Sequence, residues 1–97
     1  EVHNLKELEQ APLTYVDVVG VNNRNLKDFS IDQNTSIRLA AHIPNDKVKI
    51  SESGISSYYA IEKLMQAGFD GFLMGEYFML QDSPGLAAQK FIQNFES

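Results

Sequence analysis

The run TYVDVVGVN, residues 14–22, decides the fold that this sequence predicts. It is rich in valine and tyrosine and almost continuously apolar, which indicates a buried parallel strand from about Tyr15 to Val21. Two later runs, KVKISESG and FDGFLMGE, predict strands from Val48 to about Ser51 and from Gly71 to about Met74. Helical patterns separate the three runs, and this strict alternation predicts an α/β fold with parallel strands and right-handed crossovers.

Helix signals stand between these strands. Asn4 is placed to cap a first helix, Glu7 occupies the capping-box position, and Pro12 marks the exit. The other helices are expected from about Asn34 to His42, from a cap at Ser56 or Ser57 to Gly68, and from a cap at Asp82 or Ser83 onward, with Pro84 near the first position of the last helix.

The spacing of the strand ends bounds the architecture. The landmarks Glu1, Asn22, Glu52 and Gly75 are separated by 21, 30 and 23 residues. Each strand–helix unit of a (β/α)8 barrel contains about 31 residues, so the chain holds roughly three and a half units. That is too few to close a barrel alone, and it is also short for a flavodoxin-like sheet of about five strands.

Composition excludes several classes of protein. The chain has 97 residues, 43% of them hydrophobic, and its net charge of −5 argues against a non-specific nucleic-acid binder. It has no cysteine, which excludes a disulfide scaffold, a thiolate metal site and a cysteine nucleophile. No apolar run approaches the roughly 20 residues of a membrane helix. The first residue is Glu1 rather than methionine, so we expect a piece of a larger domain.

Polar residues gather where strands end and helices begin. These are Glu1 and His3, Asn22 to Arg24, Glu52 to Gly54, and Gly75 with Glu76. The carboxyl ends of parallel strands form the active face of α/β proteins, so these side chains are candidates for one site. Glycine turns there allow backbone N–H groups to approach an anion, although neither turn matches a Walker or Rossmann pattern. The simpler interpretation is that any strand–helix turn selects such residues.

The wording of four motifs points to a family. In this order, EVHN (1–4), VGVNNRNL (19–26), ISESGI (50–55) and FLMGE (72–76) resemble the C-terminal half of indole-3-glycerol-phosphate synthase. The resemblance implies a partial TIM (β/α)8 barrel, from the end of the fifth strand through the eighth strand–helix unit, with residues 1–97 as a half-barrel fragment of one domain. It implies a cytoplasmic carbon–carbon lyase of tryptophan biosynthesis, which closes the ring of a carboxyphenylamino-deoxyribulose phosphate with decarboxylation and needs no metal or organic cofactor.

The same resemblance implies roles for individual residues. Glu1 corresponds to an acid–base carboxylate near the reacting amine, Asn22 to an asparagine that hydrogen-bonds substrate, and Arg24 to an arginine near the anthranilate portion. Glu52 corresponds to an inward carboxylate with an electrostatic role. The expected phosphate cradle is Ser53, Gly54, Gly75 and Glu76. Glu76 departs from the pattern, since some relatives carry serine there, and an acidic side chain beside phosphate is unfavourable unless only its backbone binds.

Other expectations concern activity and partners. The family's general-acid lysine, its partner lysine and another glutamate lie on earlier strands, so we expect this fragment alone to be inactive. Its expected partners are a phosphorylated small molecule and either the missing half-barrel or a second copy, with no nucleic acid or membrane. The alternatives are a self-associating or flavodoxin-like module that binds a phosphate or partner without catalysis, and another phosphate-binding barrel enzyme. We expect His3 to be structural or solvent-facing.

Overall fold

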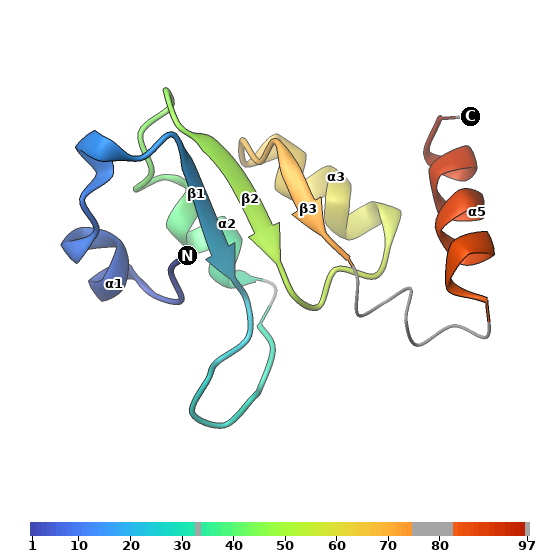
Figure 1. Ribbon diagram of the computed structural model, residues 1–97, viewed down its shortest axis with the longest axis horizontal. Helices are drawn as coiled ribbons and strands as arrows, with labels where there is room; N and C mark the ends of the chain where they lie inside the picture. The colour runs from blue at the N-terminus through green and yellow to red at the C-terminus, as the bar shows by residue number, and fades with distance from the viewer. Residues whose placement is uncertain (33, 75–82, 97) are drawn as a thin grey trace.

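The computed structural model of the chain describes residues 1–32, 34–74 and 83–96 (Figure 1). The elements, in chain order, are α1 (Leu5–Gln10), the 3-10 turn η1 (Leu13–Tyr15), β1 (Val18–Asn22), α2 (Asn34–Ala40), β2 (Val48–Glu52), α3 (Tyr58–Gln66), β3 (Gly71–Leu73) and α5 (Pro84–Glu96). The three strands form a parallel sheet in the order β1-β2-β3. The predicted alternating α/β fold is therefore confirmed, and the arrangement is consistent with part of a TIM barrel.

The residues before α1 continue the sheet beyond β1. Val2 lies parallel to Val21, its N–H donates to the carbonyl of Gly20 at 2.8 Å, and its carbonyl accepts from the N–H of Asn22 at 2.9 Å. This pairing places the first residues of the chain at the carboxyl end of β1.

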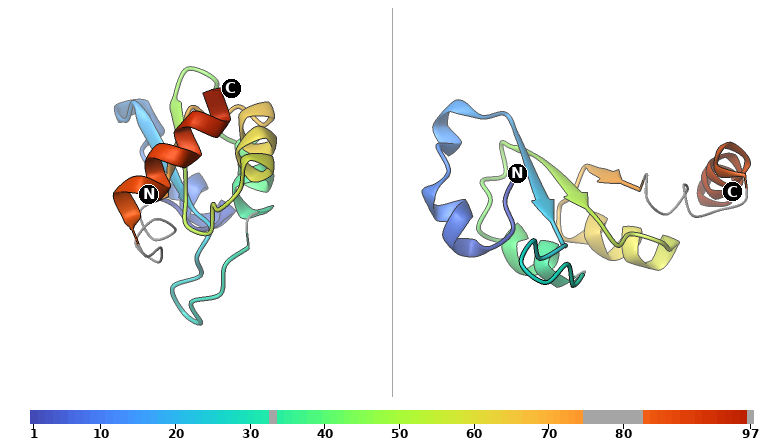
Figure 2. Two further views of the ribbon diagram at one scale, coloured as in Figure 1. Left: turned by 90° about the vertical axis from the view of Figure 1, so that its right-hand side faces the viewer. Right: turned by 60° about the horizontal axis from the view of Figure 1, so that its bottom comes forward.

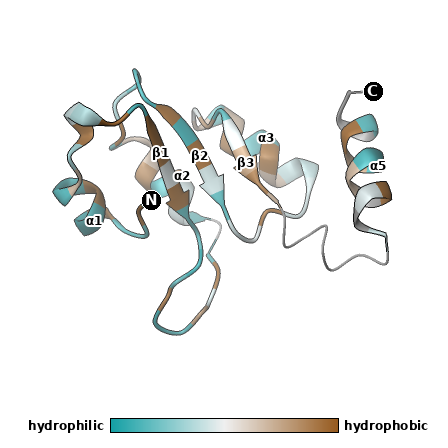
Figure 3. Ribbon diagram, in the orientation of Figure 1, coloured by the Kyte–Doolittle hydropathy of each residue, from teal (hydrophilic) through white to brown (hydrophobic). Residues whose placement is uncertain are grey.

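The two faces of the sheet differ in what covers them. Helices α2 and α3 lie on one face (Figures 1 and 2), and the side chains that alternate toward them, such as Val19 and Val21, are buried. On the opposite face Val18, Val48 and Leu73 remain 51%, 45% and 56% exposed. We call this second surface, marked by those three residues, the open face. In Figure 3 the hydrophobic colour runs along β1, whereas α1 is mostly hydrophilic.

The core lies between the sheet and the helices. Its buried apolar residues are Val2, Leu8, Val19, Val21, Leu39, Ala40, Ile43, Ile55, Ile61, Leu64 and Phe69. Phe72 and Phe91 pack against this cluster while remaining partly exposed. Tyr58 joins α3 to α5, because its ring stacks on Phe91 with centroids 4.2 Å apart and its hydroxyl donates to the Phe91 carbonyl at 2.8 Å. No helix in the described part of the chain has the length and apolar character needed to cross a membrane.

Most predicted helix boundaries are confirmed. The Asn4 side chain accepts from the N–H of Glu7 at 2.8 Å, as a cap requires. Of the two candidate serines, Ser57 is the cap of α3, since its Oγ accepts from the N–H of Ala60 at 3.1 Å. Helix α5 begins at Pro84, whereas the alternative cap Asp82 lies outside the described residues.

Two boundaries were predicted wrongly. The first strand begins at Val18 rather than Tyr15, because the chain after Pro12 closes into η1 through a hydrogen bond from the N–H of Tyr15 to the Pro12 carbonyl. The Tyr15 side chain is consequently 88% exposed. Helix α2 ends at Ala40, two residues before the expected His42.

Candidate functional site

The carboxyl ends of neighbouring strands bring three predicted site residues together. In the parallel register Asn22 lies beside Glu52, and Glu52 lies beside Leu73. Because Val2 pairs with Val21, Glu1 reaches the same edge of the sheet. Two other predicted residues, Gly75 and Glu76, lie outside the described residues.

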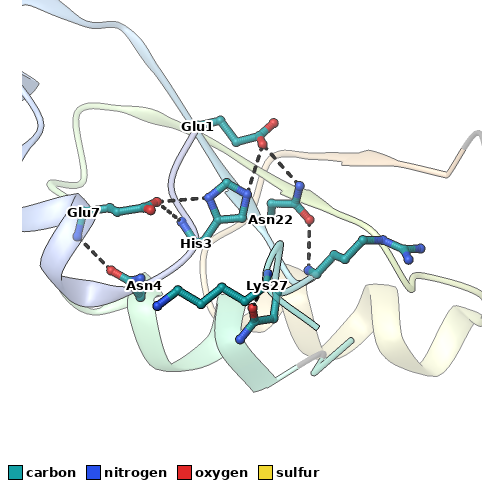
Figure 4. A network of polar contacts seen from close by, with 8 residues as sticks. Glu1, His3, Asn4, Glu7, Asn22 and Lys27 are labelled. Atoms are coloured by element: carbon teal, nitrogen blue, oxygen red, sulfur yellow. Dashed lines mark hydrogen bonds and ion pairs between the residues drawn. The ribbon is translucent and has the colours of Figure 1, made fainter. Parts of the chain in front are cut away.

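The side chain of Asn22 links these strand ends (Figure 4). Its Nδ2 donates to Oε1 of Glu1 at 3.2 Å, while its Oδ1 accepts from the backbone N–H of Arg24 at 2.9 Å and from Oγ of Ser53 at 2.7 Å. Two donors therefore fix the oxygen end of the amide, and its NH₂ end faces the carboxylate. One side chain thus connects residues from three separate segments.

The carboxyl groups of Glu1 and Glu52 are neighbours whose pKa values are shifted in opposite directions. The Asn22 amide donates to Glu1 and holds the pKa of that carboxyl below its ordinary value. Partial burial, followed by the hydrogen bond and negative charge of Glu1, raises the pKa of Glu52. As pH falls, Glu52 takes up a proton first, and the pair then consists of one acid and one carboxylate.

The absence of a side chain at Gly20 gives Glu52 its position. A Cβ built on Gly20 would lie 2.5 Å from Oε2 of Glu52. The Glu52 side chain therefore lies back over β1, toward the carboxyl of Glu1, rather than extending into solvent. Any larger residue at Gly20 would force this carboxyl to move.

The turn after β2 has an unusual backbone. Ser53 and Gly54 both have φ of +73°, a left-handed conformation that is uncommon for serine and natural for glycine. A Cβ at Gly54 would collide with the Ile31 side chain, so this position also needs glycine for space. Helix α3 begins only at Tyr58, so Gly54 belongs to the turn and not to the first turn of that helix.

Arg24 begins an ordered loop that projects beyond the end of β1 (Figure 1). It pairs with Ile31 in an isolated antiparallel bridge, and its Nη1 donates to the Phe29 carbonyl at 3.5 Å. Inside the loop Asn25 and Ser30 are joined by a backbone hydrogen bond of 2.7 Å. The guanidinium of Arg24 is thus tied to its own loop, next to the backbone that supports Asn22.

A cleft of about 750 Å³ opens between α1, this loop and α2. Its charged and titratable lining comes from all three segments: His3, Glu7, Arg24, Lys27, Asp32, Arg38 and His42. Asn22 borders the cleft, whereas Glu1 and Glu52 do not line it. Within the described ranges no group of three or more His, Asp or Glu side chains is arranged to hold a metal ion.

Sequence reasoning did not single out the role of Asn23. This residue is 3% exposed, and its Nδ2 donates to Oγ of Ser51 and to the carbonyl of Ser53, both at 3.1 Å. Its Oδ1 accepts from the N–H and Oγ of Ser36 at 3.0 and 2.7 Å. Asn23 therefore fastens the ends of β1 and β2 to the start of α2, directly behind Asn22. No local signal marks this role, because Ser36 and Ser51 stand among other polar residues in NTSIRLA and VKISE.

Comparison with known proteins gives consistent matches. A family model described as indole-3-glycerol phosphate synthase matches residues 1–91. An indole-3-glycerol phosphate synthase from Bacteroides thetaiotaomicron is 44% identical over 93 residues, which cover 96% of this chain and 35% of that protein. Another from Chlorobium chlorochromatii is 49% identical over 76 residues, 78% of this chain and 30% of that protein. The chain spans about a third of the length of these curated relatives.

The Asn23 network predicts a stability effect. Asn23→Ala should lower the free energy of unfolding by about 2–3 kcal/mol, because it leaves buried serine groups without their partner. Asn25→Ala, in the same loop but exposed, should cost less than about 1 kcal/mol. Urea unfolding of both variants measures the difference, and equal costs would contradict the assigned role of Asn23.

The carboxyl pair predicts a pH effect. Because the pKa of Glu52 is raised in the folded protein, Glu52 stabilises the fold in its protonated form. This stabilisation is fully present at low pH and is lost as the pH rises through the folded-state pKa. Glutamine in Glu52→Gln mimics the protonated acid at every pH. The free energy of unfolding of this variant, minus that of the unchanged chain, should therefore increase from about pH 4 to about pH 7. Glu9→Gln, on the exposed side of α1, is the control and should show no such trend. A flat difference for Glu52→Gln would refute the pairing.

Proposed function

Because the chain belongs to the indole-3-glycerol phosphate synthase family, we propose that it forms the C-terminal part of a (β/α)8-barrel enzyme of tryptophan biosynthesis. In this proposal residues 1–97 run from the end of the fifth strand through the eighth strand–helix unit of one domain. The parallel sheet and its consecutive strand order support this placement. The enzyme would convert 1-(2-carboxyphenylamino)-1-deoxyribulose 5-phosphate to indole-3-glycerol phosphate, with loss of carbon dioxide and water.

The observation that carries the proposal is the grouping of Glu1, Asn22 and Glu52 at one edge of the sheet. Ring closure of this substrate requires proton transfers at the amine and at the carbonyl oxygen that leaves as water. Glu1 has the lower pKa of the pair, so it is the member that stands as a free carboxylate near the amine. Glu52 holds its proton more tightly and acts electrostatically, while the amide of Asn22 orients Glu1 and faces the substrate side.

The phosphate end of the substrate is assigned to the turns beyond the strands. Ser53 and Gly54 supply two consecutive positions of positive φ in a tight turn, and turns of this kind let backbone N–H groups approach an anion. The Oγ of Ser53 is already engaged by Asn22, so its backbone is the part available to phosphate. Gly75 and Glu76 complete the cradle in this proposal. Arg24 is assigned to the anthranilate carboxylate, which a guanidinium binds well.

A second candidate function follows from the open face. Val18, Val48 and Leu73 expose apolar side chains on a surface that is the interior of a closed barrel. A module with such a surface gains free energy by covering it, either with the rest of a barrel or with another copy. This observation favours the alternative of a self-associating binding module without catalysis.

Activity of the complete enzyme tests the first proposal. A full-length protein carrying this segment should convert the substrate with a rise in indole fluorescence, and the 97-residue chain alone should show no turnover. Arg24→Ala should raise KM about 10-fold or more, as expected for a lost charge-assisted contact. Lys63→Ala, which removes an exposed cation on α3 away from the cleft that Arg24 lines, serves as the control and should leave KM unchanged. Clear turnover by the short chain, or unchanged kinetics of Arg24→Ala, would overturn these assignments.

Size-exclusion chromatography tests the open face. The 97-residue chain should elute as a dimer or larger species, because association removes the apolar surface from water. Val48→Lys should shift it toward the monomer, whereas Tyr59→Lys, at an exposed position on α3 on the other side of the sheet, should not. A monomer at every concentration would indicate a self-sufficient domain and contradict the half-barrel interpretation.

A further inference from the structure

The imidazole of His3 is held firmly by α1. Oε1 of Glu7 accepts from the backbone N–H of His3 at 2.8 Å and contacts its Nδ1 at 3.0 Å. Glu7 is itself fixed, since its own N–H donates to the capping Asn4. In a capping box the carboxylate ordinarily accepts a hydrogen bond from the backbone N–H of the cap residue. Here the Glu7 carboxylate instead accepts from the residue before the cap, His3. The His3 side chain is accordingly only 17% exposed.

The other ring nitrogen of His3 faces Glu1. Nε2 is buried, makes no hydrogen bond within the described part of the chain, and lies 3.4 Å from Oε1 of Glu1. Figure 4 shows the ring between the two carboxylates, with Glu7 on one side and Glu1 on the other. The Glu1 oxygen that His3 faces is also the oxygen to which Asn22 donates. An imidazolium donates from both nitrogens and so satisfies two flanking carboxylates at once.

We propose that His3 is a positioning residue that holds the Glu1 carboxylate against Asn22, with Glu7 as its anchor. The inference rests on the proposed function, in which Glu1 is the acid–base group. The Glu1 side chain is exposed, so contacts from its neighbours define the direction of its carboxylate. Asn22 provides one contact from β1, and His3 provides the second from the start of α1.

Charged groups from several elements surround this arrangement. Glu7 and Glu1 flank the ring directly, and Glu52 lies beyond Glu1. The cleft that His3 lines also receives Arg24, Lys27 and Asp32 from the loop, Arg38 from α2, and His42 from the residues after α2. His3 contributes to holding the pKa of Glu1 down, after the larger effect of Asn22, and its hydrogen bonds also lower the pKa of Glu7. Removing the imidazole should therefore raise the pKa of Glu1.

Two substitutions separate positioning from simple structural support. An asparagine carries its amide nitrogen at the place of Nδ1, so His3→Asn keeps a donor for Glu7 and loses the group that faces Glu1. A glutamine carries its amide nitrogen at the place of Nε2, so His3→Gln keeps a donor for Glu1 and loses the side-chain contact with Glu7. Both variants retain the backbone hydrogen bond from residue 3 to Glu7.

The experiment measures kcat, KM and the pH profile in the full-length protein. His3→Asn should lower kcat about 10-fold with little change in KM, and the acidic limb of its profile should move to higher pH. His3→Gln should keep more of the activity and the original limb. The reverse order, or an unmoved limb in His3→Asn, would show that His3 only supports α1. Should both variants unfold, Glu7→Gln decides, because it loosens the anchor without touching Glu1, and an unmoved limb in that variant overturns the proposal.

The unchanged protein separates this inference from the function on which it rests. If the unchanged full-length protein fails to form indole-3-glycerol phosphate, the proposed function is wrong and the role of His3 falls with it. If the unchanged protein is active and the two histidine variants behave alike, only the positioning role is wrong.

Discussion

The parallel register at the ends of β1 and β2 is the constraint on which the site depends. It sets Asn22 beside Glu52 and, through the pairing of Val2 with Val21, brings Glu1 to the same edge. A slip of one residue would turn each of these side chains to the opposite face of the sheet. The two donors on Oδ1 of Asn22 then leave its NH₂ no direction other than toward Glu1. Backbone pairing therefore sets the chemistry before any substrate contact is considered.

The two consecutive asparagines, Asn22 and Asn23, make their contacts on opposite faces of the sheet. Side chains alternate along an extended chain, so Asn22 points to the open face and Asn23 to the helices. Asn22 organises charged groups in partial contact with water, whereas Asn23 satisfies buried serines from α2 and β2. Because the carbonyl of Ser53 also accepts from Asn23, the turn that carries Gly54 is fixed from behind. Rigid support of this kind lets a left-handed serine persist at Ser53.

Sequence patterns predicted the features that depend on local physics. The cap at Asn4, the three strands and the gathering of polar residues at strand ends follow from short-range signals and from alternation. The strand start at Tyr15 was wrong because a turn after Pro12 competes with extended structure. The roles of Asn23 and Gly20 were out of reach, since their partners Ser36, Ser51 and Glu52 are distant in sequence. The contacts of His3 were missed for another reason: Glu7 and Glu1 are close to it in sequence, but the contact with Glu7 depends on where the helix starts and that with Glu1 on the pairing of Val2 with β1.

The pKa values of the Glu1 and Glu52 carboxyls depend on what covers the open face. The pKa of Glu52 is raised chiefly because its carboxyl is partly removed from water, and secondarily because Glu1 lies beside it. Hydrogen bonds shift the pKa of Glu1 in the opposite direction, downward, and these bonds survive further burial. A protein segment placed over Val18, Val48 and Leu73 would remove more water from Glu52. It would thereby widen the difference between the pKa values of the Glu1 and Glu52 carboxyls. The contrast between the pKa values of the two carboxyls at this edge is therefore already present in the described chain, and a segment that covers the open face would change these pKa values as well as the packing.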